Sequence, residues 1–125
     1  MEVKETTINS SVFTIHVESS TEPEFIDITE TVSQYVNDSG ISNGFALIFS
    51  KHTTAAITIQ ENEPLLLQDL SNLLGKFSPK EDAYQHNDFS VRTVNMHKNE
   101  CPNGHSHCQH LILGSSETVP VLDGI

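Results

Sequence analysis

Histidines and cysteines gather in one short segment of this sequence. Five of them lie between Glu100 and His110, namely Cys101, His105, His107, Cys108 and His110. Imidazole and thiolate are the side chains that bind zinc and similar divalent metals. The segment therefore predicts a metal site, although its spacing matches no standard zinc finger.

Three interpretations of this segment stay open. It could form a closed structural site with its own ligands, or a site with an open coordination position that His86 or His52 joins from elsewhere. Alternatively, its histidines are partly buried polar residues and its cysteines pack as small hydrophobic residues. The density of ligand-type side chains favours a metal, with zinc expected.

Other polar groups could take part in catalysis. His52 and Thr53 open a His-Thr-Thr motif, in which a histidine can act as acid or base and hydroxyls can bind oxyanions, although a surface turn is the plainer interpretation. Glu61 and Asp69 could bind a divalent cation or orient a histidine.

A third candidate motif runs from Tyr84 to Asp88. Tyr84, His86 and Asp88 form a set that could transfer protons, although an ordinary surface loop would have a similar composition.

Composition narrows the class of protein. The 125 residues suffice for a single domain, 1–125, with one core. With 17 acidic and 6 basic residues the net charge is −11, which disfavours binding to nucleic acids and to anionic membranes. The N-terminal residues lack the basic and apolar order of a signal peptide, so we expect a cytoplasmic protein with reduced cysteines.

Hydrophobic periodicity predicts strands over 7–18, 44–50, 54–61 and 118–122. A helix is expected from Thr21, another from Asn62 to Gly75 with Leu66, Leu67, Leu70, Leu73 and Leu74 facing inward. Residues 88–94 could be a short strand or an extended loop. A helix over about 105–113, with Asn103 before it and Gly114 after it, is favoured over a strand. The fold class is α+β, with a mixed, mainly antiparallel sheet and two to three helices.

The motifs together resemble one family. They comprise His52-Thr53-Thr54-Ala55-Ala56, Ile59-Gln60-Glu61-Asn62, Asp69-Leu70, Tyr84-x-His86-x-Asp88, Asn103-x-x-x-His107, Gly114-Ser115-Ser116 and Val119-Pro120-Val121-x-Asp123-Gly124. In this order and spacing the sequence resembles the YjbQ family, also called secondary thiamine-phosphate synthase, over nearly the whole chain.

The resemblance implies a homotrimer of compact α+β subunits with polar clefts near the subunit boundaries. It implies a histidine-bound metal, plausibly zinc, and the site residues His52, Thr53, Glu61, Asp69, His86, Asn103 and His107. The implied reaction joins a pyrimidine-methyl diphosphate to a thiazole phosphate and releases pyrophosphate.

Two departures from the family pattern stand out. The family usually has an Asn-Ala-Pro-Ala-His run where this chain has Asn103-Gly104-His105-Ser106-His107, so the additional ligand-type residues resemble a subgroup elaboration. Family members continue through a Leu-Gly-x-Trp-Gln strand and a final strand with arginines. The resemblance therefore implies that the domain 1–125 is incomplete at its C-terminal end.

Overall fold

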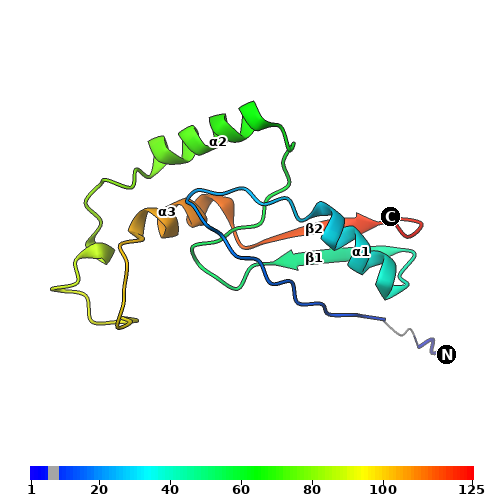
Figure 1. Cartoon of the computed structure of the whole chain (residues 1–125). Helices are drawn as coiled ribbons and strands as arrows, with labels where there is room; N and C mark the ends of the chain where they lie inside the picture. Colours follow the sequence, from blue (N-terminus) through cyan, green and yellow to red (C-terminus); the bar gives the residue numbers. More distant parts are fainter. Residues whose placement is uncertain (6–8) are drawn as a thin grey trace. The chain divides into compact units, whose positions relative to one another are not determined.

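The computed structural model describes residues 1–5 and 9–125, which form two compact units. Unit 1 comprises residues 1–46 and 119–125, and unit 2 comprises residues 47–118. The elements are α1 (Thr29–Ser39), β1 (Gly44–Phe49), α2 (Pro64–Phe77), the short 3-10 helix η1 (Gln85–Asn87), α3 (Gly104–Leu113) and β2 (Ser116–Val121) (Figure 1). Within the described ranges, no helix is both long and apolar enough to cross a membrane.

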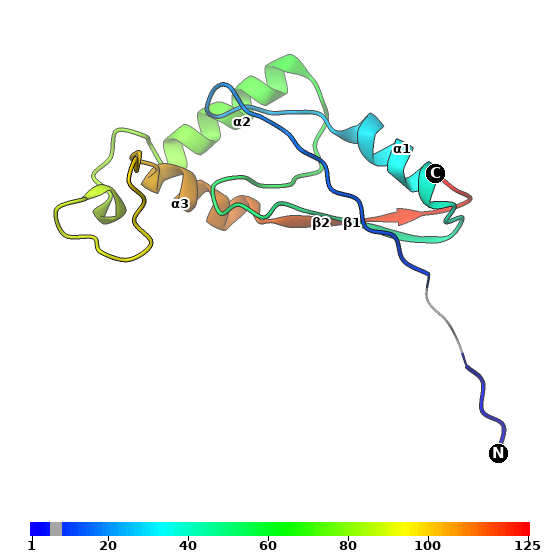
Figure 2. The same ribbon diagram turned by 60° about the horizontal axis from the view of Figure 1, so that its bottom comes forward.

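The strands β1 and β2 pair as a two-stranded antiparallel sheet, which Figure 1 shows with the strands side by side and Figure 2 shows with the strands overlapping. The Ser50 N–H donates to the Ser115 carbonyl at 2.8 Å, and the Gly124 N–H donates to the Ser42 carbonyl at 2.8 Å. The pairing thus runs in opposite chain directions. Both strands match the predicted ranges closely, and the predicted α+β class is confirmed.

The N-terminal part of unit 1 differs from the prediction. Of the expected strand over 7–18, residues 7 and 8 lie outside the described residues, and residues 9–18 form no strand. Phe13 instead stacks on Tyr35 of α1, with ring centroids 4.6 Å apart. The strand predicted from the β-branched pattern is wrong here, because β-propensity reports a fit to a half-buried surface, and Val12 is 92% exposed and Val17 47% exposed.

The first helix begins at Thr29 rather than near Thr21, so the predicted start is wrong. The Asp27 carboxylate accepts hydrogen bonds from the backbone N–H and the hydroxyl of Thr29, at 2.9 and 2.6 Å. The helix ends where Gly40 adopts a left-handed backbone with φ of 73°. The Asp27 carboxylate therefore marks the observed start of the helix by binding the first helical residue.

In unit 2, α2 begins as predicted. The Glu63 carboxylate accepts the N–H groups of Leu65 and Leu66 at 3.0 and 2.7 Å, and Pro64 occupies the first helical position. The helix continues through Gly75 to Phe77, so Gly75 is not its end. Leu73 is 61% exposed and does not face inward. The inward face passes through Leu74, which is buried.

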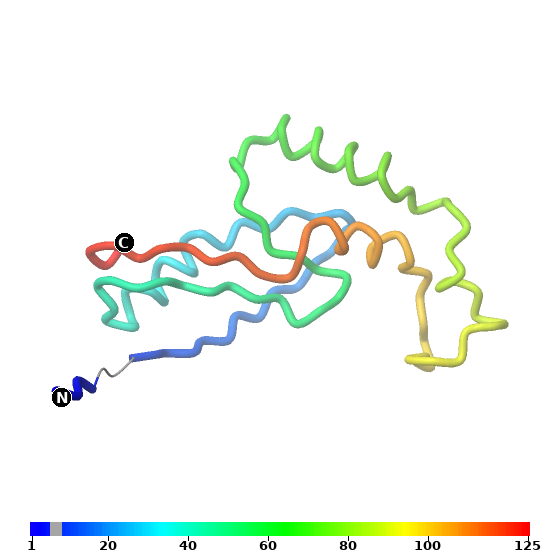
Figure 3. Tube along the Cα trace, turned by 180° about the vertical axis from the view of Figure 1, so that it is seen from behind, coloured from blue at the N-terminus to red at the C-terminus, as the bar shows by residue number. Residues whose placement is uncertain are grey.

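Two further segments of unit 2 are irregular. The expected strand over 54–61 does not form. In the described structure of this segment, the Ile57 N–H donates to the Gly114 carbonyl at 3.3 Å, a single hydrogen bond of the kind that joins neighbouring strands. Residues 88–94 form turns, and the Arg92 N–H donates to the Asp88 carbonyl at 2.9 Å. In Figure 3 the chain leaves α2, makes a long excursion through this region and returns to the start of α3.

The helix predicted over 105–113 is confirmed as α3, and its N-terminus packs on η1. The Gly104 N–H donates to the Asn87 side-chain carbonyl at 3.0 Å. A Cβ on Gly104 would lie 2.6 Å from the Cβ of Tyr84, closer than real Cβ atoms approach other atoms. Glycine is therefore required at this junction because of space.

Gly104→Ala should lower the free energy of unfolding by about 1–3 kcal/mol, because the added methyl group overpacks the η1–α3 junction. Gly75→Ala is the matched control, since a Cβ at this helical position meets no atom within 4 Å. It should be stabilising by up to about 1 kcal/mol, because alanine has the higher helix propensity. Urea denaturation measures both, and an equal shift of both variants would contradict the junction model.

Candidate functional site

Two of the predicted metal ligands, His86 and His107, lie against each other within unit 2. Their ring centroids are 4.7 Å apart and the ring planes meet at 75°, an edge-to-face arrangement. His86 belongs to η1 and His107 to α3, so the η1–α3 junction brings them together. Both side chains are half-buried. We call these two residues the histidine pair.

The ring nitrogens of the histidine pair differ in their partners. The His86 Nε2 atom is buried and has no hydrogen-bond partner among the described residues. The backbone of Thr53 lies beside the His107 ring and raises the pKa of His107, as a hydrogen-bond acceptor does. A bond with this effect has the imidazole N–H donating to the carbonyl. In neutral His107 the other ring nitrogen then carries a free lone pair.

The surroundings of His107 keep its ring neutral. Burial is the largest effect and lowers the pKa of His107 below its ordinary value of 6.5, and the nearby His86 lowers it further. The bond to Thr53 opposes this change without reversing it. Since a metal binds the neutral imidazole, the low pKa leaves His107 ready to coordinate at neutral pH.

Asn103 lies immediately before α3 and contributes a second unsatisfied atom. Its Oδ1 is buried without a hydrogen-bond partner in the described part of the chain, and it makes no side-chain cap to α3. Its carbonyl accepts the His107 N–H at 3.2 Å. Buried polar atoms without partners are rare in folded proteins, so a bound ion, water or ligand is the usual explanation.

The other predicted ligands on α3 serve packing. His105 is 5% exposed, its Nε2 lies 3.2 Å from the Ser106 hydroxyl, and its carbonyl accepts from the Ser78 hydroxyl at 3.1 Å. The His110 Nε2 lies 2.8 Å from the Ser115 hydroxyl. The side chains of both histidines therefore contact serines.

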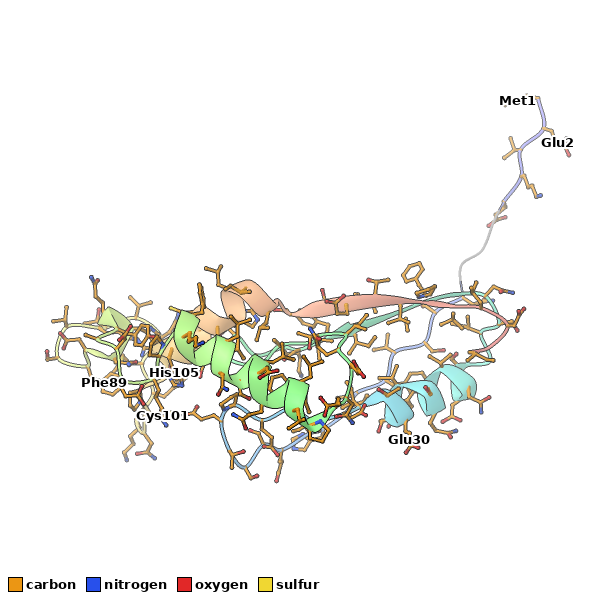
Figure 4. All side chains as sticks on the ribbon, turned by 90° about the horizontal axis from the view of Figure 1, so that it is seen from above. Met1, Glu2, Glu30, Phe89, Cys101 and His105 are labelled. Carbon is orange, nitrogen blue, oxygen red and sulfur yellow. The ribbon has the colours of Figure 1, made fainter. Side chains whose placement is uncertain are left out.

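Cys101 and Cys108 are exposed free thiols. In Figure 4 the labelled Cys101 lies at the same end of unit 2 as His105 and Phe89. Within residues 1–5 and 9–125, no group of three or more histidine, cysteine, aspartate or glutamate side chains is placed to hold one metal ion. The structure thus brings two predicted ligands together, without a third such side chain beside them among the described residues.

The predicted catalytic residues are spread over several segments. His52, Glu61 and Asp69 are exposed. Asp88 is also exposed, and its carboxylate accepts the N–H and the hydroxyl of Ser90, so it organises a turn. Thr53 reaches the pair through its backbone carbonyl rather than through its hydroxyl.

Sequence reasoning missed Arg92 and Glu100. The Arg92 Nη1 lies 2.8 Å from the Glu100 Oε1, and both side chains are 11% exposed. The hydrogen bond from Arg92 is the main cause of the lowered pKa of Glu100. One signal was present in the sequence, because Arg92 is the only arginine in an acidic chain.

The family model described as UPF0047 protein YjbQ-like matches residues 13–125. The chain belongs to the YjbQ (UPF0047) family. Among curated relatives, a UPF0047 protein of Methanothermobacter thermautotrophicus is 41% identical over 101 residues, which are 81% of this chain and 63% of that protein. The UPF0047 protein YugU of Bacillus subtilis is 38% identical over 69 residues, 54% of this chain and 52% of that protein.

Solved structures of the family agree in fold. A YbjQ-like protein from Sulfolobus solfataricus superposes with a TM-score of 0.75 at 33% identity, over 86% of this chain and 70% of that one. A YjbQ/UPF0047 protein from Clostridium acetobutylicum gives 0.73 at 34% identity, over 87% of this chain and 75% of that one. The chain spans less than two thirds of the length of the Methanothermobacter relative.

The lowered pKa of His107 gives the protein a defined pH dependence. The unfolded chain takes up a proton on His107 near pH 6.5, whereas the folded protein resists it, so this contribution to stability is present above about pH 6.5 and is lost as the pH falls through the folded pKa. In metal-free protein, His107→Gln should lose less unfolding free energy between about pH 7.5 and 5.5 than the unmodified chain.

The control is His16→Gln, because the His16 side chain is 87% exposed. Urea denaturation at each pH, with NMR titration of the imidazole protons, provides the measurement. An equal loss in the His107→Gln variant and the unmodified chain would show that His107 titrates normally in the folded state.

Proposed function

We propose that the histidine pair is a zinc-binding site of this YjbQ-family protein. The carrying observation is the contact between the two rings, whose centroids lie 4.7 Å apart, with the backbone of Thr53 beside His107. Metal-binding histidines typically donate one ring N–H to a carbonyl or carboxylate, which fixes the tautomer and leaves the other nitrogen for the metal. The buried Nε2 of His86 without a partner among the described residues supports the same assignment.

The pair suits an open, catalytic type of site. Zinc usually has about four ligands, and catalytic zinc sites keep at least one position for water or substrate. Two histidines from one chain leave positions for water, for substrate or for a side chain of a second copy. When bound, zinc would supply a Lewis acid that polarises an oxygen atom.

For the reaction, we propose the transfer implied by the resemblance, in which a pyrimidine-methyl diphosphate and a thiazole phosphate give thiamine phosphate and pyrophosphate. A chain with a net charge of −11 repels such anions, so a bound cation would supply the attraction that the side chains lack. In this proposal Asn103 binds substrate through its Oδ1, which would accept from a substrate N–H or O–H. The burial of this atom without a hydrogen-bond partner among the described residues supports that role. His52, Glu61, Asp69 and Asp88 remain candidates for acid, base or binding roles.

Protein purified without chelator should contain close to stoichiometric zinc, and His86→Ala and His107→Ala should each lower the zinc content several-fold. Each variant removes one of the two proposed ligands. Inductively coupled plasma mass spectrometry gives the metal content per chain. His16→Ala is the control, since it deletes an exposed histidine outside unit 2. Equal zinc in all four proteins would rule out the histidine pair as the metal site.

The same proteins separate catalysis from a structural role. If the site is catalytic, chelation should abolish thiamine phosphate formation and leave the fold intact by circular dichroism, and added zinc should restore activity. The alternative is a non-catalytic protein with a structural zinc site. It is supported if chelation unfolds or dissociates the protein, because structural metal sites contribute directly to folding.

We further propose that the protein assembles as a homotrimer. One face of α2 leaves Leu65, Leu73 and Phe77 at 75%, 61% and 50% exposure, which is costly for apolar side chains of a lone subunit. Light scattering should give about three times the 13.8 kDa mass of the chain. Leu73→Glu should shift the protein towards monomer, whereas Gln34→Glu adds the same charge on α1 and should not. A monomeric unmodified protein would refute the proposal.

A further inference from the structure

We propose that Arg92 and Glu100 form a positioning pair for His86, holding the loop between η1 and α3 so that the two rings of the histidine pair meet. We call this ion pair and its hydrogen bonds the clamp. The effect of the clamp on zinc affinity rests on the proposed metal function. Its effect on the contact between the two rings can be tested without metal.

The hydrogen bonds of Arg92 show that it organises backbone. Its Nη1 donates to the His86 carbonyl at 3.3 Å, its Nε to the Val94 carbonyl at 3.2 Å and its Nη2 to the Asn95 carbonyl at 2.6 Å. With the bond to Glu100, these contacts use all but one of the N–H donors of a guanidinium group. The side chain is therefore occupied by the loop and is not free to bind substrate phosphate.

Glu100 completes the clamp from the other end of the loop. Its Oε1 accepts from Arg92 at 2.8 Å, and its Oε2 accepts the His97 N–H at 3.2 Å. Asn95 adopts the left-handed backbone with φ of 54°, a conformation that asparagine tolerates better than most residues. The loop thus folds back on Arg92 and presents its carbonyls to the guanidinium.

The clamp connects directly to His86 and, through the next residue, to the helix that carries His107. It holds the carbonyl of His86 itself, and the neighbouring Asn87 accepts the Gly104 N–H at the start of α3. At 11% exposure of both side chains, the ion pair is shielded from the solvent that weakens exposed salt bridges.

The test compares four variants in the full chain: Arg92→Met, Arg92→Lys, Glu100→Gln and Lys98→Met. Lys98→Met is the matched control, because it removes a positive charge from an exposed position of the same loop. The first measurement is the NMR contact between the His86 and His107 rings in metal-free protein. The second is the affinity for added zinc, by competition with a chelating dye.

Arg92→Met should lose the contact between the rings and bind zinc about 10- to 100-fold more weakly, the range seen when groups that orient metal ligands are removed. Arg92→Lys should be intermediate, because an ammonium group can pair with Glu100 but cannot reproduce the forked contacts to the carbonyls. Glu100→Gln should also weaken binding, and Lys98→Met should match the unmodified chain. Far-UV circular dichroism should show retained helix content in all four.

Two outcomes are decisive and distinct. If Arg92→Met keeps the contact between the rings, or binds zinc as tightly as Lys98→Met, the clamp does not position His86 and the inference is wrong. If the unmodified chain binds no zinc, the proposed metal function fails, and the contact between the rings alone then decides whether the clamp orders the loop.

Discussion

The close approach of Gly104 to Tyr84 and Asn87 is the constraint on which the candidate site depends. A Cβ at this position would lie 2.6 Å from the Tyr84 Cβ, so no larger side chain fits without displacing η1 or α3. The hydrogen bond from the Gly104 N–H to the Asn87 side chain orients the start of α3 against η1. Because this junction holds η1 against the start of α3, the rings of His86 and His107 are held in contact.

A polar network supports the junction from the side of α2. The Tyr84 hydroxyl donates to the Pro79 carbonyl at 2.6 Å and lies 2.8 Å from the Ser78 hydroxyl, while Ser78 contacts the His105 carbonyl. Gln109 donates to the carbonyls of Leu74 and Ser78, which lie at the end of α2. A side chain of α3 thus donates to two carbonyls at the end of α2, and these hydrogen bonds tie the two helices together.

The sequence predicted those features that depend on neighbouring residues. Glu63 and Pro64 mark the start of α2, because their signals act within one helical turn. Asn103 and Gly114 flank α3 as predicted, although the Asn103 side chain makes no hydrogen bond to the helix. The strand expected over 54–61 failed because pairing depends on a partner that periodicity does not specify. The ring contact of His86 with His107 and the carbonyl contacts of Arg92 join residues that only the folded loop brings together. The need for glycine at position 104 depends on the nearby atoms of Tyr84 and Asn87, which the sequence alone does not place.

The site and the sheet differ in how far apart along the chain their contacting residues lie. The η1–α3 junction and the clamp link segments within residues 84–107, whereas the sheet joins Ser50 to Ser115 and Ser42 to Gly124. Closing a short loop costs less chain entropy than closing a long one, and local contacts form faster in folding. The histidine pair should therefore come into contact early in folding, before β1 and β2 pair.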